Sequence, residues 1–315
     1  MAAAGQLSNR KRAALCICAA VGLASTQDAL VKWVSGSYPV YEVLLIRCAV
    51  AFVIVGALVQ HQGGFVRLLT PHWPRVMLRS LVMCSAYLAF VLSIATIPIA
   101  DAIAVYFTMP FFVAGLSWPV LGERVRAHRW LAIAAGFIGV MIMKGVSTAI
   151  FDPALLLALW SAFAYGLGQL MGRSLSRHVT PVVLAFHQNL VYAAVALLLA
   201  AVFGLAGHSL PSSGSLAFLT RPWMMPPPGE LALMGLLGAI ASIAMVLFGA
   251  AYKNAEASFV APFEYTAMFW AVGYGVLLFG NLPDLRVALG GAVVVTAGLW
   301  MLWMDNRIRL AAQTG

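Results

Sequence analysis

Charged residues are scarce in this sequence. Only 29 of its 315 residues (19 basic and 10 acidic) are charged, which is 9%, whereas soluble domains carry roughly 25%. Apolar residues make up 63% of the chain, against roughly 45–50% in soluble proteins. A soluble fold of this length could not bury so much apolar surface. The composition therefore excludes a soluble enzyme and predicts an all-α protein that crosses a membrane several times.

Signatures of catalysis and metal binding are missing as well. The sequence has no zinc-protease, nucleophile-elbow or phosphate-loop motif, and no Cys/His spacing that suits a metal. Its four cysteines, Cys16, Cys18, Cys48 and Cys84, lie in apolar stretches and are predicted to be small core residues. We therefore predict no enzyme activity, no cofactor and no metal. The net charge of +9 forms no dense basic face, so nucleic acid is not an expected partner.

Long apolar runs fill most of the chain. A membrane-spanning helix needs about 20 apolar residues, and the sequence offers ten such runs. They lie at residues 13–34, 41–60, 76–96, 99–120, 128–144, 153–172, 181–205, 230–251, 256–279 and 285–304. The first run follows Arg10-Lys11-Arg12 but has no clean cleavage site, so we interpret it as a retained helix and not as a signal peptide.

Basic residues are distributed unequally between the two sides of the predicted membrane. With a cytoplasmic N-terminus, 14 of them fall on the inner side and 4 on the outer side, and Arg47 is left within a span. The inner set is Arg10, Lys11, Arg12, Arg67, Arg75, Arg79, Arg124, Arg126, Arg129, Arg173, Arg177, Lys253, Arg307 and Arg309. Because cytoplasmic loops carry the excess of Lys and Arg, we predict an even number of spans with both termini cytoplasmic.

The two halves of the chain show signs of an internal repeat. A shift of 142 residues aligns Gln27 with Gln169, for example, and other glycines and aromatic residues align under a shift of 158. We therefore predict two five-helix repeats, 1–150 with spans one to five and 151–315 with spans six to ten. Five spans per half is an odd number, so the repeats would have opposite orientations. Inverted repeats are a hallmark of transporters, with the substrate site near the midplane between them.

Ionisable residues within the spans are candidate functional residues, because burying a charge in a membrane is unfavourable. Asp28 in span one and Arg47 in span two both lie roughly 9 Å below the outer surface, at about 1.5 Å per residue. They are candidates for an outer gate or a contact with a substrate charge. Equally, they could form a structural ion pair between two helices. Lys32 follows Asp28 by four residues and is a competing partner.

Two further ionisable residues lie deep in the second half. Glu264 is close to the bilayer middle in the sequence Pro262-Phe263-Glu264-Tyr265, where the proline can break the helix. A shift of 158 aligns it with Tyr106, so both side chains are expected to face the axis between the repeats. Glu264 would bind a substrate ammonium or exchange a proton, or else accept a structural hydrogen bond. For His187, a cavity role competes with hydrogen bonding between helices.

Aromatic residues with a polar tip lie at similar depths in several spans. Each one alone is more often a core residue, but together they could line a cavity for flat or cationic solutes. The predicted substrate-binding residues are Gln27, Tyr87, Tyr106, Trp160, His187, Glu264 and Tyr265. The predicted gate or ion-pair residues are Asp28, Arg47 and Lys32.

Several motifs, in this order and spacing, give the chain a family resemblance. They are Asp28-Ala29-Leu30-Val31-Lys32, Pro39 followed by Arg47, Ala100-Asp101-Ala102, Gly122-Glu123-Arg124, Ala261-Pro262-Phe263-Glu264-Tyr265-Thr266 and Leu278-Phe279-Gly280. Over residues 13–304 the chain resembles the drug/metabolite transporter superfamily, in its ten-helix EamA-like branch. Asn281 departs from the pattern, because the family often has an acid after this glycine.

The resemblance implies alternating access to a central cavity between the repeats. We predict an exporter of amino acids, aromatic and bulky neutral ones above all, or of related metabolites, as a monomer in a bacterial inner membrane. Protons are a candidate coupling ion. The main alternative is an exporter of drugs or quaternary cations. A membrane enzyme and a non-transporting scaffold are remote alternatives, because the sequence shows no convergent catalytic groups and a scaffold needs no buried charges.

Overall fold

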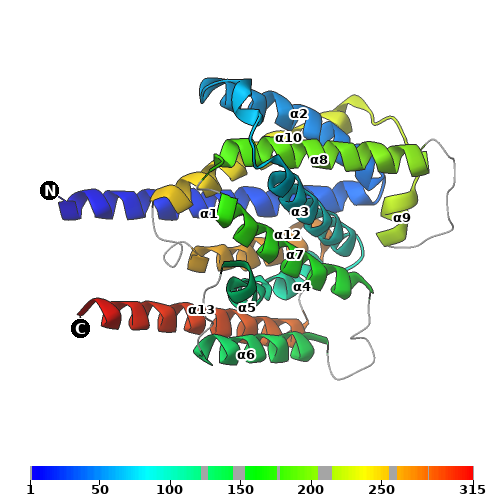
Figure 1. Cartoon of the computed structure of the whole chain (residues 1–315). Helices are drawn as coiled ribbons and strands as arrows, with labels where there is room; N and C mark the ends of the chain where they lie inside the picture. Colours follow the sequence, from blue (N-terminus) through cyan, green and yellow to red (C-terminus); the bar gives the residue numbers. More distant parts are fainter. Residues whose placement is uncertain are drawn as a thin grey trace.

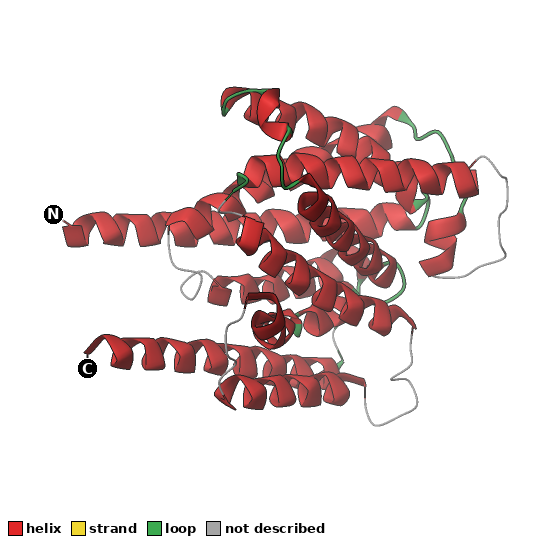
Figure 2. Ribbon diagram, viewed as in Figure 1, coloured by secondary structure: helices red, strands yellow, loops and turns green. Residues whose placement is uncertain are grey.

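The computed structural model is built of helices and their connections, and it contains no strand in the part of the chain that it describes (Figures 1 and 2). The described residues are 2–121, 127–144, 153–175, 178–204, 215–254, 261–282 and 284–314. This architecture confirms the prediction of an all-α fold.

The α-helices follow one another along the whole chain. They are α1 (Ala2–Ser35), α2 (Val40–His61), α3 (Trp73–Ile94), α4 (Ile99–Tyr106), α5 (Met109–Leu121), α6 (Ala127–Lys144), α7 (Pro153–Leu175), α8 (Pro181–Leu199), α9 (Ser215–Thr220), α10 (Pro228–Asn254), α12 (Ala267–Phe279) and α13 (Leu285–Thr314). Shorter turns are the 3-10 helices η1 (Phe65–Leu68) and η4 (Ala261–Thr266) and the π turn η3 (Ala200–Gly204).

Six segments among the described residues are long and apolar enough to cross a membrane by length and composition. They are Lys11–Ser35, Val40–His61, Trp73–Ile94, Pro153–Leu175, Pro181–Gly204 and Pro228–Phe248. Each overlaps one of the apolar runs expected from the sequence. Helices α4 to α6, α12 and α13 occupy the regions of the other four runs.

The run at 99–120 is not the single helix that we expected. α4 ends at Tyr106, and α5 begins three residues later. The Thr108 N–H donates to the Val105 carbonyl at 3.0 Å, and the Thr108 hydroxyl donates to the same oxygen at 2.8 Å, which tightens the chain into a turn. Pro110 then has no N–H to continue the helical ladder. Two short helices therefore meet here, near the depth at which the substrate site was predicted.

The run at 256–279 is also interrupted at its start. Residues 255–260 lie outside the described residues, 261–266 form the 3-10 turn η4, and α12 begins at Ala267. The position of Pro262 agrees with this late start, because proline cannot donate the hydrogen bond that a continuous α-helix requires. Glu264 therefore lies in a short turn and not within an α-helix.

Helices that pack side by side come from distant parts of the sequence. α1 packs along α10, and α3 packs along α7. α2 contacts α8 and α10, while α3 also contacts α8. α6 and α13 pair with each other at the lower edge of the view in Figure 1. Both chain ends lie on the left side of the molecule in the same view. The first and second halves of the chain therefore interleave instead of forming two separate bundles.

Glycines allow the closest of these helix crossings. A Cβ atom at Gly238 of α10 would overlap the Arg47 carbonyl oxygen of α2. A Cβ atom at Gly139 of α6 would lie 2.8 Å from the Gly290 carbonyl oxygen of α13. Neither backbone atom can move aside as a flexible side chain could, so both crossings require a residue without a side chain.

Large apolar side chains cover the outside of the bundle. Phe269 and Leu277 of α12 are 82% and 81% exposed, and Leu15 of α1 and Val53 of α2 are each 73% exposed. A water-exposed surface rarely carries so many large apolar groups. The outer surface is therefore that of a protein surrounded by lipid.

At the end opposite the chain termini, residues 221–227 connect α9 to α10 and bind the turn between α1 and α2. We call these residues the far-end connection. Arg221 Nη1 donates to the carbonyls of Ser35 at 3.1 Å and Tyr38 at 3.4 Å. The Tyr41 hydroxyl of α2 donates to the Arg221 carbonyl at 2.6 Å. The connection before α10 is thus joined to the beginning of the chain.

Two glutamates also belong to this end of the molecule. Glu42, in the first turn of α2, is fully buried and accepts a hydrogen bond from the Met224 N–H at 3.2 Å. A side-chain hydrogen bond with Glu230 raises the pKa of Tyr38 to about 12. The tyrosine therefore keeps its proton at neutral pH.

Candidate functional site

Arg47 is the charge around which the candidate site is built. It lies two turns into α2, is only 8% exposed, and its guanidinium carbon is 4.4 Å from the centre of the Tyr87 ring. The centre of the Tyr192 ring is 5.8 Å away, and the two tyrosine rings stack at 5.3 Å. Aromatic faces attract a cation of this kind. The Nε and Nη1 atoms of Arg47 are buried and have no hydrogen-bond partner.

A chain of hydrogen bonds leads from Tyr192 to a second buried arginine. The Tyr192 hydroxyl of α8 donates to the Met83 carbonyl of α3 at 3.0 Å and accepts from Gln188 Nε2 at 3.0 Å. Arg79 Nη1 of α3 donates to Gln188 Oε1 at 3.1 Å, and its Nε donates to the Gly168 carbonyl of α7 at 3.2 Å. Arg79 therefore joins α3 to both α7 and α8.

A second group of polar aromatic residues lies where α4 ends. The rings of Tyr106 and Tyr165 meet edge to face at 5.6 Å, and their hydroxyls are hydrogen-bonded. Tyr165 is also hydrogen-bonded to the side chain of Gln169 on α7. The charge of Glu264 acts on both tyrosines. Tyr106 and Glu264 are therefore close enough to interact electrostatically, while their placement on an axis between two repeats stays a prediction.

Asp28 links the two groups. Its charge acts on Tyr87 beside Arg47 and on Tyr106 at the end of α4. Arg47 in turn acts on the Asp28 carboxyl, although the hydrogen bonds and ion pairs of the described residues include none between these two side chains. Asp28 is therefore a nearby counter-charge that leaves Nε and Nη1 of Arg47 without a partner.

Lys32 points to a different place from the one that the sequence suggested. Its Nζ donates to the carbonyls of Ile94 and Ile97, both at 2.6 Å, and lies 5.5 Å from the centre of the Phe279 ring. These carbonyls belong to the end of α3 and the loop after it, where a cation is favourable. Asp101 is the carboxylate that acts on Lys32. Lys32 is therefore not the partner of Asp28.

The remaining predicted residues occupy varied positions. Gln27 is buried in α1 at 8% exposure, and His187 is buried with its Nδ1 donating to the Val183 carbonyl of its own helix at 2.9 Å. Trp160 is half exposed on α7, and its ring centre lies 5.5 Å from that of Phe163. The side chain of Tyr265 lies outside the described residues. The structure thus brings together Asp28, Arg47, Tyr87, Tyr106 and Glu264, and it does not bring Lys32, His187 or Trp160 to them.

Arg79 and Tyr192 are the members of this network that sequence reasoning missed. We counted Arg79 among the inner-side basic residues, but it is 8% exposed within α3. Its position inside the apolar run 76–96, instead of before it, is the signal that could have identified it. Tyr192 had no charge or motif nearby that would distinguish it from core residues.

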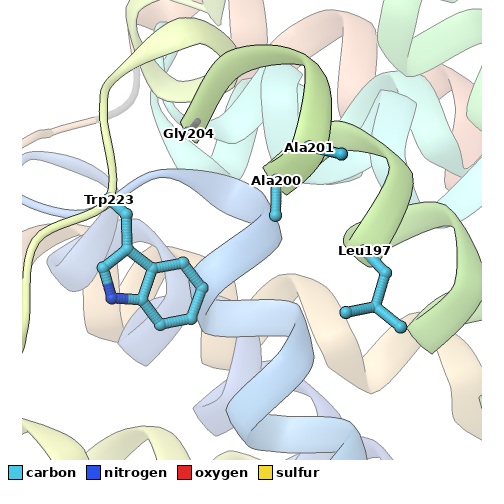
Figure 3. Close-up of a pocket in the computed structure, with 5 residues that line it drawn as sticks. All are labelled: Leu197, Ala200, Ala201, Gly204 and Trp223. Carbon is cyan, nitrogen blue, oxygen red and sulfur yellow. The ribbon is translucent and has the colours of Figure 1, made fainter. Parts of the chain in front are cut away.

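An apolar pocket of about 340 Å³ lies away from these side chains, beside the far-end connection (Figure 3). Its lining consists of Leu197, Ala200, Ala201, Gly204 and Trp223. Figure 3 shows the Trp223 indole facing the end of α8 and the π turn η3. Among the residues that the structure describes, the lining of this pocket includes no charged side chain.

No metal centre is formed by the residues that the structure describes, since they include no group of three or more His, Cys, Asp or Glu side chains close enough to hold an ion. Outside the central network, His72 and His178 stack with their ring centres 4.6 Å apart. This pair alone does not provide the ligand number of a structural metal site.

Apolar helices that enclose charged and aromatic side chains within their bundle define a multi-pass membrane protein with a polar site in its interior, the arrangement typical of transporters. A sequence model of the EamA-like transporter family matches residues 11–144 and 152–304. The chain belongs to the EamA-like transporter family. It is therefore a membrane transporter of the drug/metabolite superfamily and not an enzyme.

Three relatives illustrate the range of this family. The chain is 32% identical to a riboflavin transporter of Rhizobium johnstonii over 76% of this chain and 72% of the relative. It is 27% identical to the pseudopaline exporter CntI of Pseudomonas aeruginosa over 87% of this chain and 89% of the relative. It is 22% identical to an S-adenosylmethionine uptake transporter of Rickettsia prowazekii, over 90% of each chain.

A solved crystal structure with 20% sequence identity has a similar fold. Its TM-score is 0.64, and the match covers 94% of this chain and 98% of that one. At this identity the likeness concerns the fold alone. It agrees with the family assignment made from the sequence.

Proposed function

We propose that this transporter exports amino acids, aromatic and bulky neutral ones above all, or related metabolites, by alternating access through a central site. The observation that carries the proposal is the network of Arg47, Tyr87, Tyr106, Asp28 and Glu264. It combines charges of both signs with ring faces, and its members come from both halves of the chain. A zwitterion with a ring or a bulky apolar side chain has the complementary chemistry.

Each part of such a substrate has a candidate contact. The carboxylate would meet Arg47 or nearby hydroxyl and amide donors, and the ammonium would meet Glu264 or the aromatic faces. The apolar part would pack against Tyr106, with Tyr265 along the rest of the path. Glu264 and His187 are the groups through which transport would be coupled to protons.

Alternating access requires two halves that can rock against each other, and we propose the inverted repeats 1–150 and 151–315 for this role. The packing supports them. Exchanging the halves converts the pair α1 and α10 into α7 and α3, and converts α2 and α10 into α8 and α3. All four helix pairs are in contact. The two stretches matched by the family model fall one in each half.

The proposed setting is a bacterial inner membrane, with ten spans, both termini cytoplasmic and a monomer as the transporting unit. The support for the orientation is the excess of basic residues on that side of the sequence-derived topology and the shared side of the two chain ends in Figure 1. Relatives include both an exporter and an uptake transporter, so the direction proposed here rests on the family resemblance of the motifs.

The alternative substrate class is drugs or quaternary cations. The tyrosines and the two carboxylates Asp28 and Glu264 would suit a cation. The names of the relatives also show that substrates vary within the family. The buried Arg47 opposes it, because a permanent cation would be repelled by a guanidinium in the same site.

Counterflow in proteoliposomes tests the proposal. Vesicles that hold the purified protein and unlabelled phenylalanine should accumulate labelled phenylalanine from outside. Unlabelled aromatic amino acids should compete, whereas quaternary ammonium compounds and nucleosides should not. No accumulation with folded protein would reject the amino acid assignment, and inhibition by quaternary cations alone would favour the alternative.

A further inference from the structure

Arg47 carries more donors than the protein uses. An arginine side chain has five N–H donors and is always charged in proteins. The Arg47 side chain is only 8% exposed. Its Nε and Nη1 atoms are shielded from solvent and have no hydrogen-bond partner. A buried donor of a charged group that lacks a partner is unfavourable and therefore rare in folded proteins. This arginine is consequently one partner short in the structure.

The groups around Arg47 stabilise its charge without occupying these donors. The faces of Tyr87 and Tyr192 lie beside the guanidinium, and the Tyr87 hydroxyl also contacts it. Asp28 acts on it through space. Ring faces interact with the positive charge as a whole and accept no N–H in the manner of an oxygen atom. The missing partner is therefore an acceptor.

Arg79 shows what a structural arginine looks like in the same protein. It is equally buried at 8% exposure, yet its Nε and Nη1 donate to the Gly168 carbonyl and to Gln188 Oε1. Its donors of the same type are satisfied by the protein itself. Arg47 differs in that the protein provides no acceptor for its Nε and Nη1 donors, so an acceptor from outside the chain could bind there.

We infer that Arg47 is the anchor for a carboxylate of the transported molecule, and that the substrate class is small organic acids with a ring or bulky apolar group. This inference rests on the proposed function, and it narrows the candidate contacts for the substrate anion to one residue. A carboxylate supplies two acceptor oxygens and pairs well with a guanidinium. A single negative charge also suits the site better than a dianionic phosphate, because Asp28 and Glu264 are already nearby.

The rings of Tyr87 and Tyr192 stack on each other at 25° beside the guanidinium. The part of a substrate next to a carboxylate on Arg47 would therefore meet aromatic side chains. The class therefore includes aromatic amino acids but does not require an amino group. Arylacetates belong to it equally, while amides and permanent cations do not.

Binding to the purified full-length protein in detergent tests the inference without requiring transport. The probes are two acid and amide pairs, phenylalanine with phenylalaninamide and indole-3-acetate with indole-3-acetamide, plus phenyl phosphate. The readout is the melting temperature as a function of probe concentration, because a ligand of the folded state raises it. We expect at least one acid to stabilise the wild type, with its amide about ten- to a hundredfold weaker.

Matched arginine variants identify the residue responsible. R47K keeps the buried charge but lacks the planar set of donors, and we expect it to fold and to lose most of the preference for the acid. R75K, at an exposed arginine of α3 outside the network, should keep the preference of the wild type for acid over amide. An R47K protein that no longer unfolds cooperatively would show that the guanidinium serves the fold, and this result overturns the inference.

The outcomes for the two proposals are separable. If phenylalanine shows no counterflow while an acid binds through Arg47, the amino acid assignment fails and the carboxylate anchor remains. If transport occurs but acids and amides bind alike, or R47K keeps the preference, the anchor is wrong and the transport proposal remains. Binding of phenyl phosphate but of neither acid would also overturn the inferred class.

Discussion

Two buried cations, Arg47 and Arg79, and the partly buried Lys32 differ in what satisfies their donors. Lys32 donates to two carbonyls at the end of α3, and Arg79 donates to a carbonyl and an amide on neighbouring helices. Arg47 lies against aromatic faces with two unpartnered nitrogens. The protein itself thus supplies the partners of two cations, which makes them connectors between helices, and leaves the third for recognition.

Removing Lys32 should lower stability without changing substrate preference. In K32M the carbonyls of Ile94 and Ile97 lose the charged donor that each contacts at 2.6 Å. We expect a loss of about 2 kcal/mol in the free energy of unfolding, seen as a lower melting temperature in detergent. R75M replaces an exposed arginine of α3 and should change stability by less than about 0.5 kcal/mol. Equal effects of the two variants would contradict the role of Lys32.

Glu264 should control how transport responds to pH. E264Q keeps the size of the side chain and removes its proton exchange, in a position where the charge acts on Tyr106 and Tyr165. In counterflow measured across a pH series, we expect the wild-type rate to vary with pH and the variant rate to be flat. D284N, which removes an exposed carboxylate outside the network, serves as the control. A pH profile unchanged in E264Q would remove the proposed coupling.

Charges inside apolar runs were the residues that the sequence could identify. Asp28, Arg47 and Glu264 stand out because almost nothing else in their spans is charged. The sequence does not give the rotation of each helix about its own axis. The exposure of the Trp160 side chain and the direction of the Lys32 side chain could therefore not be derived. The donors that satisfy Arg79 depend on two other helices, and no local pattern predicts them.

At the scale of elements, the crossing of α2 and α10 is the tightest contact near the site. A Cβ atom at Gly238 would overlap the carbonyl oxygen of Arg47 itself. G238A should therefore separate the two helices, shift Arg47, and lower the free energy of unfolding by about 1–3 kcal/mol. G273A on α12, where a Cβ meets no heavy atom within 4 Å, is the matched control and should melt like the wild type. Melting temperatures and acid binding of both variants check this expectation.

The two interrupted helices were predictable to different degrees. Pro262 predicted the late start of α12, because proline lacks the backbone N–H that donates a hydrogen bond in an α-helix. The break after Tyr106 was not expected, since membrane helices often tolerate a proline such as Pro110. Here the Thr108 hydroxyl also binds the Val105 carbonyl and fixes the turn. The residue that decides the break is thus a threonine whose effect depends on its side-chain rotamer.

At the scale of the whole molecule, both chain ends lie on one side (Figure 1). We expect a fluorescent protein fused after the last residue to mature in the cytoplasm and an alkaline phosphatase at the same place to be inactive. Phosphatase fused after Ser37, in the turn between α1 and α2, should be active. The opposite pattern would reverse the proposed orientation, and equal activity at both positions would contradict an even number of spans.

Composition was sufficient to predict the class of the molecule, because 63% apolar residues have no place in a soluble fold of this size. It was not sufficient to predict how the halves interleave. The packing of α1 on α10 and of α3 on α7 depends on contacts between helices that are far apart in the sequence, which no periodicity within a helix reveals. The weak internal repeat in the sequence indicated a relation between the two halves, but it did not predict which helices of the two halves contact each other.

The far-end connection offers a further consequence. Its residue Arg221 binds carbonyls of Ser35 and Tyr38, and Glu42 binds the N–H of Met224, so one small surface combines segments from both halves of the chain. An antibody fragment raised against the exposed residues 222–225 of this connection would recognise a shape that these contacts hold in place. Such a reagent would bind only to molecules in which this end is closed and would keep it closed. Its rate of binding would therefore report the fraction of transporters with this end closed.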